Sequence, residues 1–259
     1  MNKKQLILIG GAVLLFCFIY FGMSTIPKNM KDLEMSRSAN IESTGIQNLV
    51  MDAKKGLSDD KHNIIQAMQA EFKSAEDNTE KVDKAKRLAS KWYEYGYPII
   101  SGYFAEEVAT IENTKDAWSI AGTTYSIGMK GSDKEKEIAF AKKRAIGAFE
   151  KAISLAEDEN IDDRINLALI YVNNPDTNPM QGIQMLMGLN EKYPESVLVL
   201  NQLARLAILT GQIDKAIARL EKALSIEPEN NNSICLIADA YLKDGQSTKA
   251  KEFFDICKK

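Results

Sequence analysis

The stretch from 197 to 229 constrains the fold of this chain more than any other. Its first half predicts a helix with one apolar face, through residues at i, i+3, i+4 and i+7: Leu200, Leu203, Ala204 and Ala207. Its second half predicts a similar helix through Ile213, Ala216, Ile217, Leu220, Ala223 and Leu224. Gly211 fits a left-handed cap between the helices, and Pro228 ends the second one. The stretch therefore reads as a helical hairpin.

Similar hairpins recur along the chain. A helical hairpin this short cannot bury both of its faces, so it needs copies of itself on either side. The copies lie near 82–114, 115–160, 161–195 and 231–259. Small residues stand before each second helix at steps of 37, 34 and 34 positions, namely Ala145, Gly182, Ala216 and Ala250. Eleven more residues separate Gly122 from Ala145 than separate the corresponding pair in the 197–229 hairpin, and we expect this insertion to extend the second helix backwards.

The spacing of these residues resembles that of the tetratricopeptide repeat (TPR) family. The matching positions in the clearest copy are Leu203, Ala204, Ala207, Gly211, Ala216, Leu220, Ala223 and Pro228. The family's large aromatic residue is absent at Ala207, and Leu220 replaces its usual phenylalanine or tyrosine. The resemblance implies an all-α fold, a right-handed α-solenoid of TPR hairpins over 77–259. It also implies that the first helices line a groove that binds other proteins.

Composition excludes several other classes of protein. Helix formers dominate, and a net charge of -3 with a pI near 5.5 gives no general attraction to nucleic acid. The sequence has no HExxH, GxSxG, GxxxxGK[ST] or GxGxxG motif. Its one histidine, His62, stands where a solvated helix start is expected. We therefore expect no enzyme activity and no catalytic, cofactor-binding or metal-binding residues.

The three cysteines do not form a metal or redox motif. They are Cys17, Cys235 and Cys257, with no CxxC spacing. The last two fall in the two helices of the 231–259 hairpin, where they can be close in space. We expect both to be buried free thiols, because free cysteine packs well in a protein core.

Residues 1–27 predict a single-pass membrane anchor. The apolar run 6–23 would span roughly 27 Å as a helix, close to the thickness of a bilayer's hydrocarbon core. Gly22 to Ser24 offers a passable cleavage site, but the bulky residues before it favour a retained anchor. Lys3 and Lys4 favour a cytoplasmic head, which places the rest of the chain outside the cytoplasm, at a bacterial-type inner membrane. Residues 28–76 then form a helical stalk of one or two helices, or pack back on the first repeat.

The TPR resemblance implies which side chains line the groove. Carried over by position, the candidates are Ser119, Thr123, Ile165, Leu169, Val172, Asn201, Arg205, Ile208, Asp239, Leu242 and Lys243. The clearest hairpin leaves Asn201, Arg205 and Ile208 free to select a partner. The last hairpin has no polar capping helix after it, so Phe253 or Ile256 is expected to contact a partner or a second copy.

The combination of an anchor with stacked repeats predicts a membrane-anchored scaffold that binds protein partners. Such a protein is an adaptor, an assembly factor or a chaperone-like holder in the cell envelope. One alternative is a self-associating structural subunit of an envelope complex. Another is an assembly factor of the cytochrome c maturation type, although no CxxCH motif is present.

Overall fold

The structure, a computed structural model, describes residues 45–157, 161–174 and 180–257. Every regular element in these ranges is an α-helix, which confirms the all-α prediction for them. The chain divides into two compact units at Asp52 and Ala53, and helix α3 (Ile46–Lys55) crosses that division. In the described part, no helix is both long and apolar enough to cross a bilayer. The predicted anchor, 6–23, lies outside the described residues.

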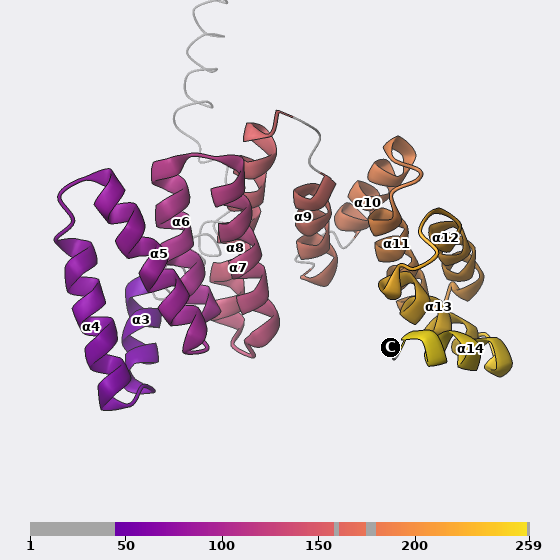
Figure 1. Cartoon of the computed structure of the whole chain (residues 1–259), viewed down its shortest axis with the longest axis horizontal. Helices are drawn as coiled ribbons and strands as arrows, with labels where there is room; N and C mark the ends of the chain where they lie inside the picture. The colour runs from indigo at the N-terminus through magenta and orange to yellow at the C-terminus, as the bar shows by residue number, and fades with distance from the viewer. Residues whose placement is uncertain (1–44, 158–160, 175–179, 258–259) are drawn as a thin grey trace, which may run out of the picture. The chain divides into compact units, whose positions relative to one another are not determined.

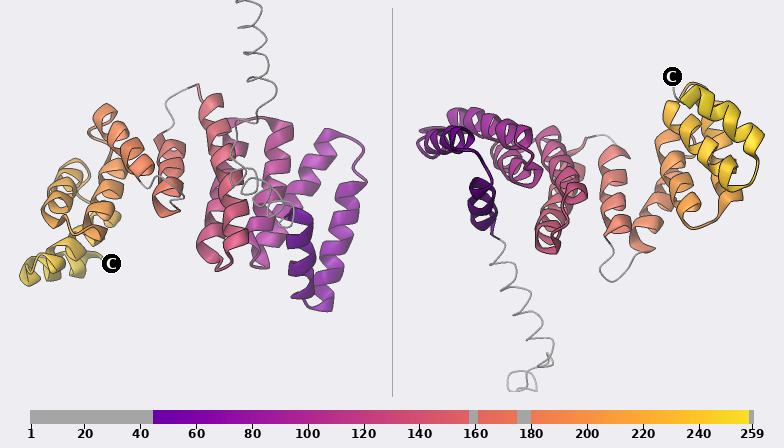
Figure 2. Two further views of the ribbon diagram at one scale, coloured as in Figure 1. Left: turned by 180° about the vertical axis from the view of Figure 1, so that it is seen from behind. Right: turned by 90° about the horizontal axis from the view of Figure 1, so that it is seen from below.

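The second unit is built from antiparallel helical hairpins that follow one another along the chain (Figures 1 and 2). In each hairpin the two helices pack together, and the second helix packs on the first helix of the next hairpin. The first helices are α5 (Asn78–Glu94), α7 (Lys115–Gly131), α9 (Ile161–Asn173), α11 (Val197–Leu209) and α13 (Asn231–Lys243). The second helices are α6 (Pro98–Glu112), α8 (Glu135–Leu155), α10 (Met180–Lys192), α12 (Ile213–Ile226) and α14 (Ser247–Cys257).

Helix α4 (Asp59–Lys73) packs against α5 and belongs to the same compact unit. Ile65 is fully buried, and the Phe72 ring meets the edge of Phe104 in α6 with 5.5 Å between the ring centroids. Residues 59–73 thus pack on the first hairpin.

The turns between helices use the residues that the sequence predicts. Gly211 has a φ of +74°, in the left-handed region that favours glycine, which confirms its predicted role as a cap. Gly96 and Gly245 occupy the same place in their hairpins, with φ of +85° and +80°. After each glycine, the next backbone N–H donates to a carbonyl in the last turn of the first helix, as Gln212 does to Ala207 at 2.8 Å. These turns keep the hairpins tight.

The small residues that set the repeat step lie between the paired helices. Ala145, Ala216 and Ala250 are at most 1% exposed, and Gly182 is also buried. A Cβ on Gly182 would lie 2.3 Å from the carbonyl oxygen of Ala168, closer than real Cβ atoms approach. Helices α9 and α10 therefore meet at a contact that admits only glycine.

The insertion in the second hairpin lengthens both of its helices. Helix α7 has 17 residues and α8 has 21, whereas α9 and α10 have 13 each. The sequence predicted a backward extension of the second helix alone. That prediction was incomplete, because Met129 and Gly128 are buried and hold another turn of α7 against its neighbours.

Polar contacts join α6, α7 and α8. The Tyr125 hydroxyl donates to the Glu106 carboxylate at 2.7 Å, and Arg144 donates to the other oxygen of the same carboxylate at 2.8 Å. Burial, and then the charge of Glu106, raise the pKa of Tyr125 well above its usual range. Burial, followed by Glu107, raises the pKa of Tyr103 in α6 to about 12. These tyrosines are therefore neutral hydrogen-bond donors at ordinary pH.

Cys235 and Cys257 form a disulfide, with 5.1 Å between their Cα atoms. The expectation of two buried free thiols was wrong. Helix α14 runs back along α13, and this brings its last residue, Cys257, beside the first half of α13. Both cysteine residues are only partly buried, so the pair is a covalent link across the last hairpin rather than core packing.

Alkaline pH should destabilise the last hairpins through Tyr241, whose hydroxyl donates to Glu221 at 2.9 Å. Burial, and then this hydrogen bond, raise the pKa of Tyr241 from 10.0 to about 12. Below pH 10 the tyrosine is protonated in the folded and unfolded chains alike, so this group adds no pH dependence. Between about pH 10 and 12 the unfolded chain releases the proton first, and stability falls as pH rises. Urea denaturation across this range should show a shallower fall for Tyr241→Phe than for the wild type, and parallel curves would contradict this.

Candidate functional site

The first helices of the hairpins carry many of the large apolar side chains that the structure leaves exposed. We call the exposed side chains of α5, α7, α9, α11 and α13 the first-helix face. Its large apolar members are Tyr93, Ile120, Ile127, Leu198, Leu209 and Leu242. Leu209, at 72% exposed, is the most exposed of them. These side chains make the first-helix face the candidate for contact with another molecule, since binding sites commonly expose large apolar groups.

Asn201 does not belong to this exposed set, contrary to its prediction. It is 1% exposed on α11, where its amide oxygen accepts a hydrogen bond from the Ser233 hydroxyl at 2.8 Å. Its amide nitrogen donates to Asn230, the residue that caps α13, at 3.4 Å. Asn201 therefore fastens one hairpin to the next and is not free to select a partner.

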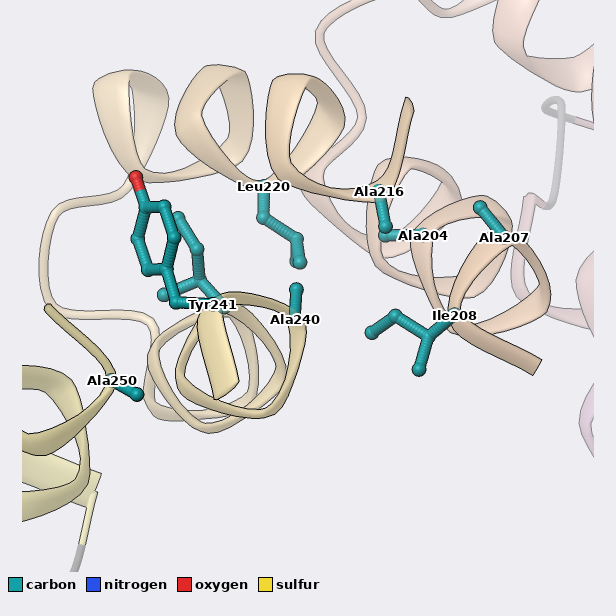
Figure 3. Close-up of a cluster of buried hydrophobic side chains, with 9 residues drawn as sticks. Ala204, Ala207, Ile208, Ala216, Leu220, Ala240, Tyr241 and Ala250 are labelled. Carbon is teal, nitrogen blue, oxygen red and sulfur yellow. The ribbon is translucent and has the colours of Figure 1, made fainter. Parts of the chain in front are cut away.

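Ile208 is also buried, at 6% exposed, and its prediction as a free side chain was wrong. It packs in a cluster with Ala204, Ala240 and Tyr241. Figure 3 shows its side chain on the side of α11 that faces α13. The next residue, Leu209, is the one that the first-helix face presents. The predicted residue differs from the exposed one by a single position, because the helix turns by 100° per residue and the register of the stack decides which side chain is covered.

The other predicted residues in the last two hairpins are accessible. Arg205 is exposed and donates to Asn232 at 3.3 Å. Leu242 is half exposed, and Lys243 lies 3.6 Å from the Asp239 carboxylate in an exposed ion pair. A pair of that kind adds little stability, so both charges are available to a ligand. The binding role of these four residues stays a prediction.

The two residues predicted on the last helix differ from each other. Phe253 is partly buried and stacks on the Tyr241 ring, with 5.8 Å between the centroids. Ile256 is half exposed. Phe253 therefore completes the packing of α13 against α14, and Ile256 is the better candidate for a contact. That contact is also still a prediction.

Stability measurements should separate Asn201 from Arg205. Asn201→Ala leaves the buried Ser233 and the partly buried Asn230 without its amide, so we expect a loss of about 1–3 kcal/mol. Arg205→Ala removes an exposed side chain and should change stability by no more than about 0.5 kcal/mol. Urea denaturation of the two variants measures both values. Equal losses would show that Asn201 is not a structural tie.

A cleft of about 210 Å³ opens between α7 and α9. Its apolar lining comes from Met129, Leu169 and Ile170. Its polar lining comes from Ser126, Lys130, Asn166, Asn173 and Asn174. Of the side chains predicted from the sequence to line the groove, only Leu169 lines this cleft. Such a lining offers apolar contact, amide hydrogen bonds and one positive charge.

Buried polar contacts hold α9 at both of its ends. At its start, the Asp163 carboxylate is 3% exposed and accepts a hydrogen bond from Ser119 of α7 at 2.5 Å. At its end, the Lys142 ammonium donates to the carbonyl oxygen of Asn174 at 2.7 Å. Lys142 is 8% exposed and comes from α8. The second hairpin thus fixes the position of α9, and with it the cleft between α7 and α9.

Comparison with known proteins agrees with the hairpin repeat. Residues 207–256 match the tetratricopeptide repeat family. A search of curated proteins found no match. Among solved structures, YrrB, described as a TPR protein with an unusual peptide-binding site, is 18% identical, with 73% of this chain and 91% of that chain covered and a TM-score of 0.41.

Two further structures are similar at the same level. MamA from Desulfovibrio magneticus RS-1 is 15% identical, with 71% of this chain and 95% of that chain covered and a TM-score of 0.46. The Pseudomonas aeruginosa pilF protein is 16% identical, with coverages of 68% and 74% and a TM-score of 0.48. At these scores the three structures say nothing about what this chain binds. The stretch that the family match identifies as tetratricopeptide repeat is residues 207–256.

Proposed function

We propose that this protein is a membrane-anchored scaffold that binds segments of other proteins on its first-helix face and catalyses no reaction. The observation that carries the proposal is the exposed apolar side chains on three of the described first helices, namely Ile120 and Ile127 on α7, Leu209 on α11 and Leu242 on α13. Fully burying one such side chain contributes about 1.5–3 kcal/mol. A segment that crosses several of these helices can therefore gain affinity at each of them.

Two observations support an extracytoplasmic position for the repeats. The apolar run 6–23 has the length of a membrane span, and Lys3 and Lys4 before it favour a cytoplasmic head. The Cys235–Cys257 disulfide is of a kind that persists in oxidising compartments and is rare in the cytosol. Together they favour an anchor in an inner membrane with the hairpins on its outer side.

Photo-cross-linking in intact membranes tests the binding role. A benzophenone amino acid is placed at Leu209 or Leu242 on the first-helix face, and at exposed Lys222 on α12 as the control. We expect adducts with a different protein from the first two positions and not from the third. A ladder of adducts between copies of this chain would instead support a self-associating structural subunit. The absence of adducts at both first-helix positions would overturn the proposal.

A further inference from the structure

The insertion in the second hairpin builds one wall of the cleft between α7 and α9. Helices α9, α11 and α13 have 13 residues each, and α7 is four residues longer. Met129 and Lys130 belong to this additional turn, and both line the cleft. A hairpin without the insertion has no residues in these positions. The cleft is therefore a feature of this chain's second hairpin and not of the repeat as such.

Helix α8 of the same hairpin stabilises the opposite wall. The lengthened α8 carries Lys142, whose ammonium binds the carbonyl at the end of α9. The end of a helix has a partial charge of about -0.5, which would repel an anion near Asn173 and Asn174. The Lys142 contact offsets that charge at the α9 end. Lys130 is then the charged side chain of the cleft lining, and no carboxylate is among the lining residues that the structure describes.

The size of the cleft favours a side chain as its occupant. Pockets for small-molecule ligands commonly have about 300–1,000 Å³, and this cleft has about 210 Å³. Its apolar lining, Met129, Leu169 and Ile170, suits an aliphatic or aromatic group, and its amides can bind a peptide backbone. Along α7, exposed Ile120, Ile127 and Lys130 follow at helical spacing, so the apolar surface continues from the cleft along one helix.

We propose that this cleft is a docking site for a protein segment that inserts one apolar side chain between α7 and α9 and places a carboxylate beside Lys130. The described lining carries one positive side chain, Lys130, and no acidic one, so it attracts a negatively charged group. Its apolar residues attract an apolar side chain next to that group. The inference rests on the proposed function, because it assigns the partner's chemistry at one part of the first-helix face.

Selection from a library of short capped peptides tests this assignment. The full chain in detergent is immobilised and the retained peptides are sequenced by mass spectrometry. We expect enrichment of peptides in which an acidic residue lies next to a large apolar one. Lys130→Glu should weaken these peptides roughly tenfold, since a charge-assisted hydrogen bond is lost and a repulsion is added. Lys222→Glu makes the same change of charge on α12 and should leave binding unaltered.

A second variant tests whether the charge in the cleft, and not a structural change caused by Lys130→Glu, alters binding. Asn173 is exposed, so Asn173→Asp adds a negative charge to the opposite wall without disturbing the packing. The Asn173→Asp change should weaken the binding of acidic peptides and leave the binding of their neutral amide counterparts unaffected. If peptides are retained and depend on Arg205 but not on Lys130 or Asn173, the inference fails while the proposed function stands. If no peptide is retained, the inference fails, and the cross-linking result decides the proposed function.

Discussion

Replacing Gly182 by alanine should destabilise the third hairpin by about 3 kcal/mol, at the upper end of the usual cost of overpacking. The added Cβ would lie 2.3 Å from the Ala168 carbonyl oxygen and 2.8 Å from the Val172 backbone nitrogen. Both obstacles are backbone atoms of α9, so no change of side-chain conformation can relieve them. Helices α9 and α10 must move apart, and the packing of Leu186 against Ile165 and Ala168 is lost with them.

Gly188→Ala is the matched control on the same helix. A Cβ on Gly188 meets nothing within 4 Å, so this substitution should add up to about 1 kcal/mol through the better helix propensity of alanine. Thermal unfolding followed by circular dichroism should show a melting temperature lowered by roughly 6–12 °C for Gly182→Ala and slightly raised for Gly188→Ala. Hydrogen exchange should place the loss in α9 and α10. Equal behaviour of the two variants would show that the helices have room for the methyl group.

The hairpin repeat could be predicted because its information is local. Apolar spacing, Gly211 and the small residue of each second helix are read within one hairpin, and the structure buries Ala145, Ala216 and Ala250. The family's aromatic positions were not needed. The predicted helices form because residues at this spacing share one apolar face in a helix, and packing that face against a neighbour buries it from water.

The candidate site was harder to predict because it depends on contacts between hairpins. Ser119 meets Asp163, Ile165 packs with Val199, and Asn201 meets Ser233. The three pairs join the same two repeat positions on neighbouring first helices. Polar side chains contact polar ones in two of the pairs, and apolar side chains pack together in the third. Aligning the repeats and comparing these columns is the signal that would have shown Asn201 to be structural. A polar residue on a first helix is otherwise easily mistaken for an exposed one.

The cleft has no comparable signal in the sequence. Met129 and Lys130 lie in the insertion, where the repeat pattern gives no position, and the end of α9 forms the other wall. The residues of the two walls cannot be matched from the sequence until the length of α7 is known. The individual features of this chain therefore lie where the repeat pattern is interrupted.

Loss of the Cys235–Cys257 disulfide should cost the last hairpin about 3 kcal/mol. The bonded residues are 22 positions apart, and closing a loop of that length in the unfolded chain accounts for roughly this amount. Helix α14 has few other ties, since its buried contacts are Ala250 and the partly buried Phe253 and Phe254. Cys257→Ser should therefore let α14 separate from α13 well before the other hairpins unfold.

Hydrogen exchange and urea denaturation measure this effect. Cys235→Ser and Cys257→Ser should lose the same stability, with faster exchange confined to α13 and α14. A dithiol reductant should lower the stability of the wild type to that of the variants and leave the stability of the variants unchanged. Cys17→Ser retains the disulfide pair and serves as the control. A reductant effect on the variants themselves would contradict the disulfide as the cause.

The same bond links stability to location. If the hairpins lie outside the cytoplasm, rapid acid quenching of cells followed by thiol alkylation should find Cys235 and Cys257 oxidised. A chain that is fully reduced in cells would overturn the proposed extracytoplasmic position and leave the stability result intact. In that case α14 would be held by its apolar contacts alone, and Ile256, half exposed beside Cys257, would lie on a helix that separates easily from its neighbour. The oxidation state of one pair of thiols thus decides whether helix α14 offers a fixed surface or a loosely held one.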